Sequence, residues 1–140
     1  MVNITINNLQ KKLPIPGMRV KKLVLKILKG EGFNKSGYIN ICFMDNTLIR
    51  KLNTRFLSAH RATDVIAFNL SDKKTKPFLL ADIAISTDSA INNAGDFKAT
   101  PEDELMLYVA HGILHILGFN DHTRAQTLLM RKKEKSYVNR

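Results

Sequence analysis

The sequence contains no tryptophan, a single cysteine and no long apolar run. Because Cys42 has no second cysteine to pair with, an internal disulfide is excluded and nothing calls for an oxidising compartment. No apolar run approaches the roughly 18 residues that a transmembrane helix needs. The N-terminus also lacks the basic and apolar regions of a signal peptide. We therefore expect a soluble, cytoplasmic protein.

Acidic residues are scarce. The 140 residues include 12 Asp and Glu against 22 Lys and Arg, so the formal net charge is +10. Such an excess favours polyanionic partners, nucleic acid first and an anionic membrane surface second. The hydrophobic fraction of 44% is ordinary for a globular protein. The length predicts one domain over residues 1–140, large enough to bury a core without a structural metal.

Apolar periodicity predicts an alternation of strands and helices. Period-two patterns predict strands at 2–7, 38–44, 63–70 and 79–86, and 71–77 is predicted to be a polar loop. Helical periodicity predicts helices from Met18 to Gly30, after Asp45, over 87–94 with Gly95 at the end, and after Thr100. We expect an α+β fold, in which a small mixed sheet of about four strands carries packed helices.

The last of these helices contains the most informative residues. Thr100 is a good N-cap, and from Leu105 to Phe119 the segment is apolar nearly all round, which is typical of a buried central helix. His111 and His115 nevertheless lie within it. Because they are four residues apart, their side chains project from one helical face and can reach a single metal ion.

A turn with further metal-binding residues follows these histidines. Gly118 can adopt the left-handed conformation that ends the helix, after which Asp121 or His122 can return to the same ion. The spacing matches the His-x3-His-x2-Gly-x2-His pattern of metzincin peptidases, with Asp121 in the third ligand position. Gly112, however, stands where those peptidases carry a general-base glutamate. Peptidase activity is therefore disfavoured.

The residues His111–Phe119, with the sequence His-Gly-Ile-Leu-His-Ile-Leu-Gly-Phe, resemble the signature of the YbeY family of bacterial rRNA maturation endoribonucleases. Residues 63–68 and 81–86 resemble two strands of that family, and these blocks occur in the family's order over about residues 40–135. The resemblance implies a small α+β fold with zinc in a cleft. It also implies cleavage of single-stranded RNA in ribosome maturation, with ribosomal RNA and the small ribosomal subunit as partners.

The same resemblance identifies candidate site residues. His111 and His115 match the first two metal ligands of the family. Asp121 occupies the third position without a gap, whereas His122 would need a one-residue insertion. We therefore predict that zinc binds His111, His115 and Asp121.

Many members of the family carry an arginine, thought to engage RNA phosphate, six residues before the position of Thr63. That position is Leu57 in this sequence, and Arg55 and Arg61 flank it. Either arginine could supply the guanidinium group. Arg55 and Arg61 are therefore the candidate RNA-binding residues.

Five other charged residues have two interpretations each. Asp64 and Asp82 could orient a ligand or a water molecule, or they could accept backbone hydrogen bonds at strand ends. Lys132, Lys133 and Lys135 could form a solvated helix face or help to guide RNA.

The leading functional hypothesis is a zinc-dependent endoribonuclease. The alternative is a non-catalytic RNA- or ribosome-binding assembly factor in which zinc only holds the end of the helix.

Overall fold

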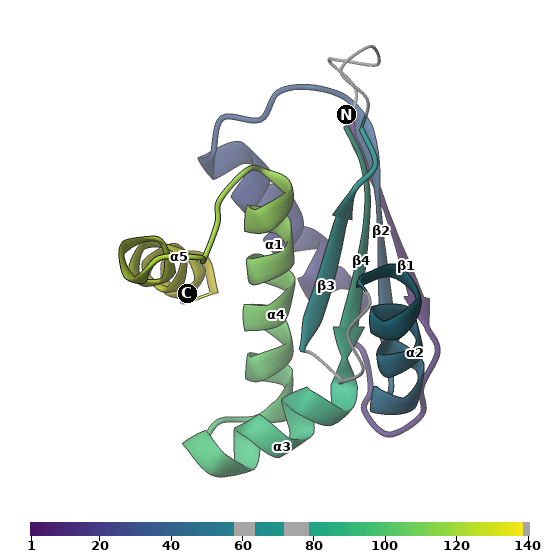
Figure 1. Ribbon diagram of the computed structural model, residues 1–140. Helices are drawn as coiled ribbons and strands as arrows, with labels where there is room; N and C mark the ends of the chain where they lie inside the picture. The colour runs from purple at the N-terminus through teal and green to yellow at the C-terminus, as the bar shows by residue number, and fades with distance from the viewer. Residues whose placement is uncertain (58–63, 72–78, 139–140) are drawn as a thin grey trace.

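The structure of the chain, a computed structural model, describes residues 1–57, 64–71 and 79–138 (Figure 1). In these residues the strands are β1 (Val2–Asn8), β2 (Gly37–Met44), β3 (Val65–Asn69) and β4 (Leu79–Ser86). The helices are α1 (Gly17–Gly30), α2 (Asn46–Leu57), α3 (Thr87–Phe97), α4 (Pro101–Ile116) and α5 (Arg124–Val138). No described helix is long and apolar enough to cross a membrane.

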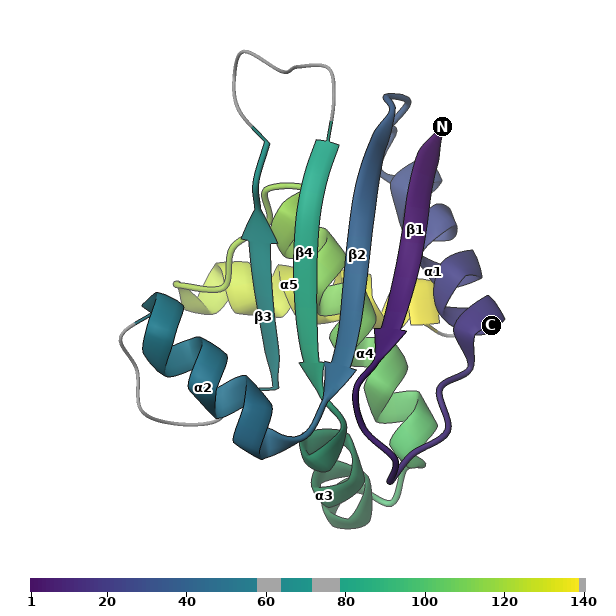
Figure 2. The same ribbon diagram turned by 90° about the vertical axis from the view of Figure 1, so that its right-hand side faces the viewer.

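The strands form one mixed sheet in the order β1-β2-β4-β3. β2 pairs in parallel with β1 and β4, whereas β3 pairs antiparallel with β4 (Figure 2). The predicted α+β fold with a small mixed sheet is therefore confirmed.

Helices cover both faces of this sheet. α1 and α4 lie on one face and α2 lies on the other, while α5 crosses α4 on the side away from the sheet (Figures 1 and 2). Alternate strand residues such as Ile39, Ile41 and Ile83 point to the α1 and α4 side and form the main core. A smaller cluster, which includes Met44, Ile49 and Ile66, lies under α2. α4 is buried between the sheet and α5, as its sequence predicts.

Gly112 allows α4 to pack closely on the sheet. A Cβ atom at this position would lie 2.9 Å from Ile83 Cγ2 and 3.3 Å from Val65 Cγ1, so no larger residue fits without a shift. The position that carries the general base in metzincins therefore faces the sheet here. A glutamate at position 112 would enter the core.

Most of the predicted helix ends agree with the structure. Asp45 Oδ1 accepts from the Leu48 amide at 2.9 Å, and Thr100 Oγ1 accepts from the Asp103 amide at 3.1 Å, so both residues are N-caps. The prediction that a helix ends at Gly95 is wrong. α3 continues to Phe97 and ends at Lys98, which has the left-handed φ of 54°.

Other boundaries differ by a few residues, as helix and strand ends commonly do. α4 ends at Ile116 rather than nearer Phe119, and β3 begins at Val65 rather than at position 63. Most of the predicted loop at 71–77 lies outside the described residues.

Candidate metal centre

The two histidines of α4 lie on one face of the helix. The Nε2 atoms of His111 and His115 are 3.0 Å apart, and each ring is about one quarter exposed. The prediction that the two side chains reach one point is therefore confirmed.

The chain turns back sharply after α4. Gly118 has a φ of +105°, and its amide donates to the His115 carbonyl at 3.0 Å. The Phe119 amide donates to the Leu114 carbonyl at 3.0 Å, so these two bonds form a Schellman motif. The predicted role of Gly118 as the residue that ends the helix is confirmed, and the turn brings the next residues back toward α4.

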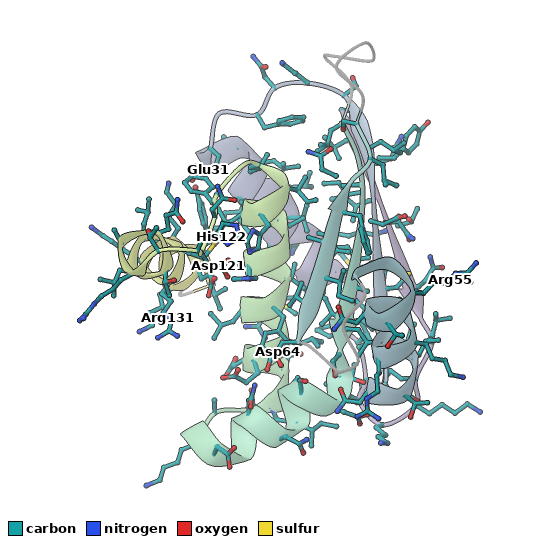
Figure 3. All side chains as sticks on the ribbon, in the orientation of Figure 1. Glu31, Arg55, Asp64, Asp121, His122 and Arg131 are labelled. Atoms are coloured by element: carbon teal, nitrogen blue, oxygen red, sulfur yellow. The ribbon has the colours of Figure 1, made fainter. Side chains whose placement is uncertain are left out.

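Asp121 lies between the end of α4 and the start of α5 (Figure 3). Thr123 Oγ1 accepts from the Gln126 amide, and Gln126 Oε1 accepts from the amide of Thr123, which is the reciprocal pattern of a capping box. The Thr127 hydroxyl donates to the Asp121 carbonyl at 3.2 Å. The capped start of α5 therefore fixes the backbone that carries Asp121.

Asp121 completes a three-residue group. Its Oδ2 atom lies 3.6 Å from Nε2 of His111 and 3.6 Å from Nε2 of His115. In the part of the chain that the structure describes, this is the one group of at least three His, Cys, Asp or Glu side chains with ligand atoms close enough to share an ion. His122 is exposed and does not belong to the group.

These side chains suit zinc. Tetrahedral zinc, with bonds of about 2.1 Å, places its ligand atoms about 3.4 Å apart, and the observed separations of 3.0 to 3.6 Å bracket that value. Two imidazoles and one carboxylate leave the fourth position open. Three protein ligands with an open position are typical of catalytic zinc sites, whereas structural sites are usually closed by four protein ligands.

Glu134 is a site residue that sequence reasoning missed. Its Oε2 atom lies 2.6 Å from Nδ1 of His111, and its side chain is only 13% exposed. Glu134 lies on α5, among the lysines that were interpreted as a solvated face or an RNA-guiding surface. No spacing signal in the sequence connects it with His111, because the contact depends on how α5 packs across α4.

Two hollows open beside the three-residue group. One, of about 440 Å³, runs along α4 from His111 toward Glu104, with Asp64 and Arg131 also in its lining. The other, of about 360 Å³, lies toward Asn69 at the end of β3. His111 and Asp121 line both hollows, so the group is accessible from two directions.

The first hollow has an acidic end. Burial raises the pKa of Glu104, and the neighbouring carboxylates of Asp64 and Asp103 raise it further. Arg131, from α5, lines the same hollow and supplies positive charge. A phosphate group would therefore be repelled at the Glu104 end and attracted by Arg131, while Asp121 and, from α5, Glu134 add negative charge to the same lining.

The two predicted aspartates differ in position. Asp64 lines the first hollow, and its backbone carbonyl accepts from the Ser86 amide at 2.9 Å, so the role of its carboxylate stays a prediction. Asp82 lies in the middle of β4, exposed, one residue from Ile83, whose side chain contacts α4. Because side chains alternate along a strand, Asp82 points away from the site. The interpretation of Asp82 as a ligand-orienting residue is wrong.

Arg55, one of the two candidate RNA-binding arginines, is not brought to this group. Arg55 projects from α2, on the other side of the sheet from Asp121 (Figure 3). Arg61 lies outside the described residues.

The three predicted lysines of α5 also differ from one another. Lys133 forms an ion pair with Glu31, and its ammonium group lies 4.8 Å from the centre of the Phe119 ring, whereas Lys132 and Lys135 are exposed.

The central helix of this α+β fold presents two histidines, and the glycine turn after it brings a carboxylate beside them. These features define a protein with a candidate catalytic metal site. A family model described as endoribonuclease YbeY matches residues 5–140. The chain therefore belongs to the YbeY family.

Individual relatives agree with this assignment. An endoribonuclease YbeY from Desulforamulus reducens is 30% identical, over 98% of this chain and 95% of its own length. The endoribonuclease YbeY of Syntrophus aciditrophicus is 35% identical, over 94% of this chain and 84% of its own length. The solution structure of TM1509 from Thermotoga maritima superposes with a TM-score of 0.61 at 26% identity, covering 99% of this chain and 87% of that one.

Proposed function

We propose that this protein is a zinc-dependent endoribonuclease that cleaves single-stranded RNA, with His111, His115 and Asp121 as the metal ligands. The observation that carries the proposal is the convergence of these three side chains beside two open hollows. Zinc bound there would lower the pKa of a water molecule and polarise a phosphoryl oxygen. The relatives named endoribonuclease YbeY support RNA as the substrate.

The basic residues of α5 support a polyanionic substrate. α5 carries five Lys and Arg residues, and one of them, Arg131, lines the hollow beside His111. An RNA strand held there through its phosphates would be bound with little regard to base identity. Arg55 and Arg61 stay predicted RNA-binding residues. Arg55 lies on the other side of the sheet from this hollow, and Arg61 lies outside the described residues.

The biological context follows from the family resemblance. We propose ribosomal RNA as the substrate, the small ribosomal subunit as the partner that presents it, and the cytoplasm as the compartment. The open fourth position of the metal group favours catalysis over the alternative of an assembly factor with a purely structural zinc.

Cleavage of a fluorescently labelled single-stranded RNA tests this function. We expect turnover to disappear on chelation and to return when zinc is added. His111→Ala should be inactive and still folded, because the apolar core does not depend on metal. His122→Ala is the matched control, since His122 is an exposed neighbour outside the group, and it should retain activity.

Two results would overturn the proposal. Turnover that survives both chelation and His111→Ala would show that the three-residue group is not the active site. Zinc that binds to the group without any turnover would favour the non-catalytic assembly factor.

A further inference from the structure

The carboxylate of Glu134, whose side chain is 13% exposed, contacts the ring nitrogen of His111 that faces away from the three-residue group. Oε2 of Glu134 and Nδ1 of His111 are 2.6 Å apart, while Nε2 of the same ring faces His115 and Asp121. Among the described residues, His115 has no comparable carboxylate on its Nδ1 atom. The two histidines of the group are therefore held differently.

A neutral imidazole carries one proton, and the hydrogen bond at one nitrogen decides which nitrogen holds it. An ionised carboxylate only accepts hydrogen bonds, so its partner nitrogen must be the donor. With the proton on Nδ1, the Nε2 lone pair of His111 is free to bind a metal. Carboxylate partners of this kind also make a ligand histidine more basic and fix the orientation of its ring.

We propose that Glu134 is a positioning residue that fixes the Nδ1–H tautomer of His111 and thereby strengthens metal binding. The inference rests on the metal site of the proposed function. It concerns neither the identity of the substrate nor the cleavage step.

The packing of α5 holds this carboxylate in place. Next to Glu134 in sequence, Lys133 Nζ lies 2.9 and 3.1 Å from the two carboxylate oxygens of Glu31, at the end of α1. One turn further along α5, the Tyr137 hydroxyl donates to the same carboxylate, and its ring occupies the space that a Cβ atom at Gly30 would need. Burial and the Glu31 carboxylate raise the pKa of Tyr137 to about 12, so at neutral pH the phenol stays a donor. The contacts of Lys133 and Tyr137 with Glu31 thus fix the turn of α5 that carries Glu134.

Nitrogen NMR of the histidine rings tests the tautomer directly, in metal-free protein without RNA. We expect His111 of the wild-type protein to be protonated at Nδ1. Glu134→Ala should give a mixture of tautomers at His111, and the His115 signals should change with it because the two Nε2 atoms lie 3.0 Å apart in one hydrogen bond. Lys132→Ala, an exposed neighbour on the same helix, is the matched control and should change neither ring.

Zinc affinity, measured by competition with a chromophoric chelator, is the second readout. Glu134→Ala should weaken zinc binding by about 10- to 100-fold, which is the usual effect of removing such a partner. Glu134→Gln keeps the size of the side chain and one acceptor oxygen, so it should lose less affinity. If the alanine variant does not fold, the zinc affinity and the His111 tautomer of Glu134→Gln test the inference instead. Lys132→Ala should bind zinc as the wild type does.

An unchanged His111 tautomer together with unchanged zinc affinity in both Glu134 variants would overturn the inference. Because the tautomer is read without metal or RNA, this outcome is distinguishable from failure of the proposed nuclease function. A protein that cleaves no RNA could still show the Glu134-dependent tautomer, and an active nuclease could lack it.

Discussion

At the scale of single residues, Gly112 and its neighbour His111 face opposite environments. His111 opens toward the hollows, whereas Gly112 is buried against Ile83 and Val65. Gly112, which follows the predicted metal ligand His111, thus has a packing role on this helix. This packing explains why no general-base glutamate of the peptidase pattern stands there.

Gly112→Ala should lower the free energy of unfolding by about 1–3 kcal/mol, because the new methyl group overpacks the contact between α4 and the sheet. Gly95→Ala is the control, since a Cβ atom at Gly95 in α3 meets nothing within 4 Å. We expect that change to be neutral or to stabilise the protein by up to about 1 kcal/mol. Urea unfolding of both variants checks the pair. Equal stabilities for the two variants would contradict the packing role.

Glu31 should make the stability of the protein depend on pH. Burial alone would raise the pKa of Glu31, but hydrogen bonds from Tyr137 and Lys133 outweigh burial and hold the pKa below its ordinary value. Because the pKa in the folded state lies below that of the unfolded chain, the carboxylate stabilises the fold above the unfolded pKa. This stabilisation is lost as the pH falls through the folded pKa.

Glu31→Gln should therefore be less stable than the wild type at neutral pH, with a difference that shrinks on acidification below about pH 4. Urea unfolding at a series of pH values measures the difference. A stability difference that stays constant down to the lowest pH would mean that the charge of Glu31 does not contribute.

At the scale of elements, the end of α4 and the turn before α5 together position the three residues of the candidate metal site. Gly118→Ala should cost about 1–2 kcal/mol, because a positive φ is unfavourable for a residue with a Cβ atom. The change should also displace Asp121 and weaken zinc binding. Gly32→Ala is a matched control, since Gly32 has a φ of +75° in a similar turn after α1 and its Cβ position is also open.

Both glycine variants should lose stability, and only Gly118→Ala should lose zinc affinity. Thermal unfolding and chelator competition separate the two effects. A similar loss of zinc affinity in both variants would show that the turn at Gly118 has no specific role in placing Asp121.

The sequence predicted the elements that depend on local signals. Three of these signals each extend over only one or two helical turns, and the structure agrees with each. They are the spacing of His111 and His115, the cap at Thr100 and the glycine at position 118. Of the two interpretations of Asp82, the ligand-orienting one was already opposed by a signal in the sequence, since Asp82 alternates with Ala81 and Ile83, which are buried on the α4 side.

Other features depend on packing that no local pattern encodes. Glu134 reaches His111 only because α5 crosses α4, so its role could not be predicted from spacing. The end of α3 was predicted at Gly95, but the helix continues and Lys98 accepts the left-handed conformation instead. There the Ala99 amide donates to the Ala94 carbonyl at 3.1 Å, so the backbone bond that closes the helix forms without a glycine.

At the scale of the whole molecule, positive charge is concentrated on three helices. Of the 22 Lys and Arg residues, 13 lie on α1, α2 and α5, and the one acidic residue of those helices is Glu134. Acidic residues gather instead at the start of α4, where Glu102, Asp103 and Glu104 occupy the first turn. The protein therefore presents an uneven field to a polyanion, rather than a uniform positive surface.

Binding of single-stranded RNA should be mainly electrostatic. The affinity should fall steeply with salt, with a slope of about −0.7 for each phosphate contact, because bound cations are released from the strand. Two unrelated single-stranded RNAs should bind with comparable affinity and a shared slope, since the sequence has no tryptophan and few aromatic residues for base stacking. Fluorescence anisotropy across a salt series measures both. A flat salt response, or a strong preference for one RNA, would contradict this account.

The central claim is that His111, His115 and Asp121 bind one divalent ion. Anomalous diffraction at the zinc edge, from crystals of zinc-loaded protein, tests it most directly. We expect a single strong peak about 2.0–2.2 Å from Nε2 of each histidine and from a carboxylate oxygen of Asp121. A peak ligated by His122 instead of Asp121, or a fully loaded protein with no peak between the two histidines, would contradict it.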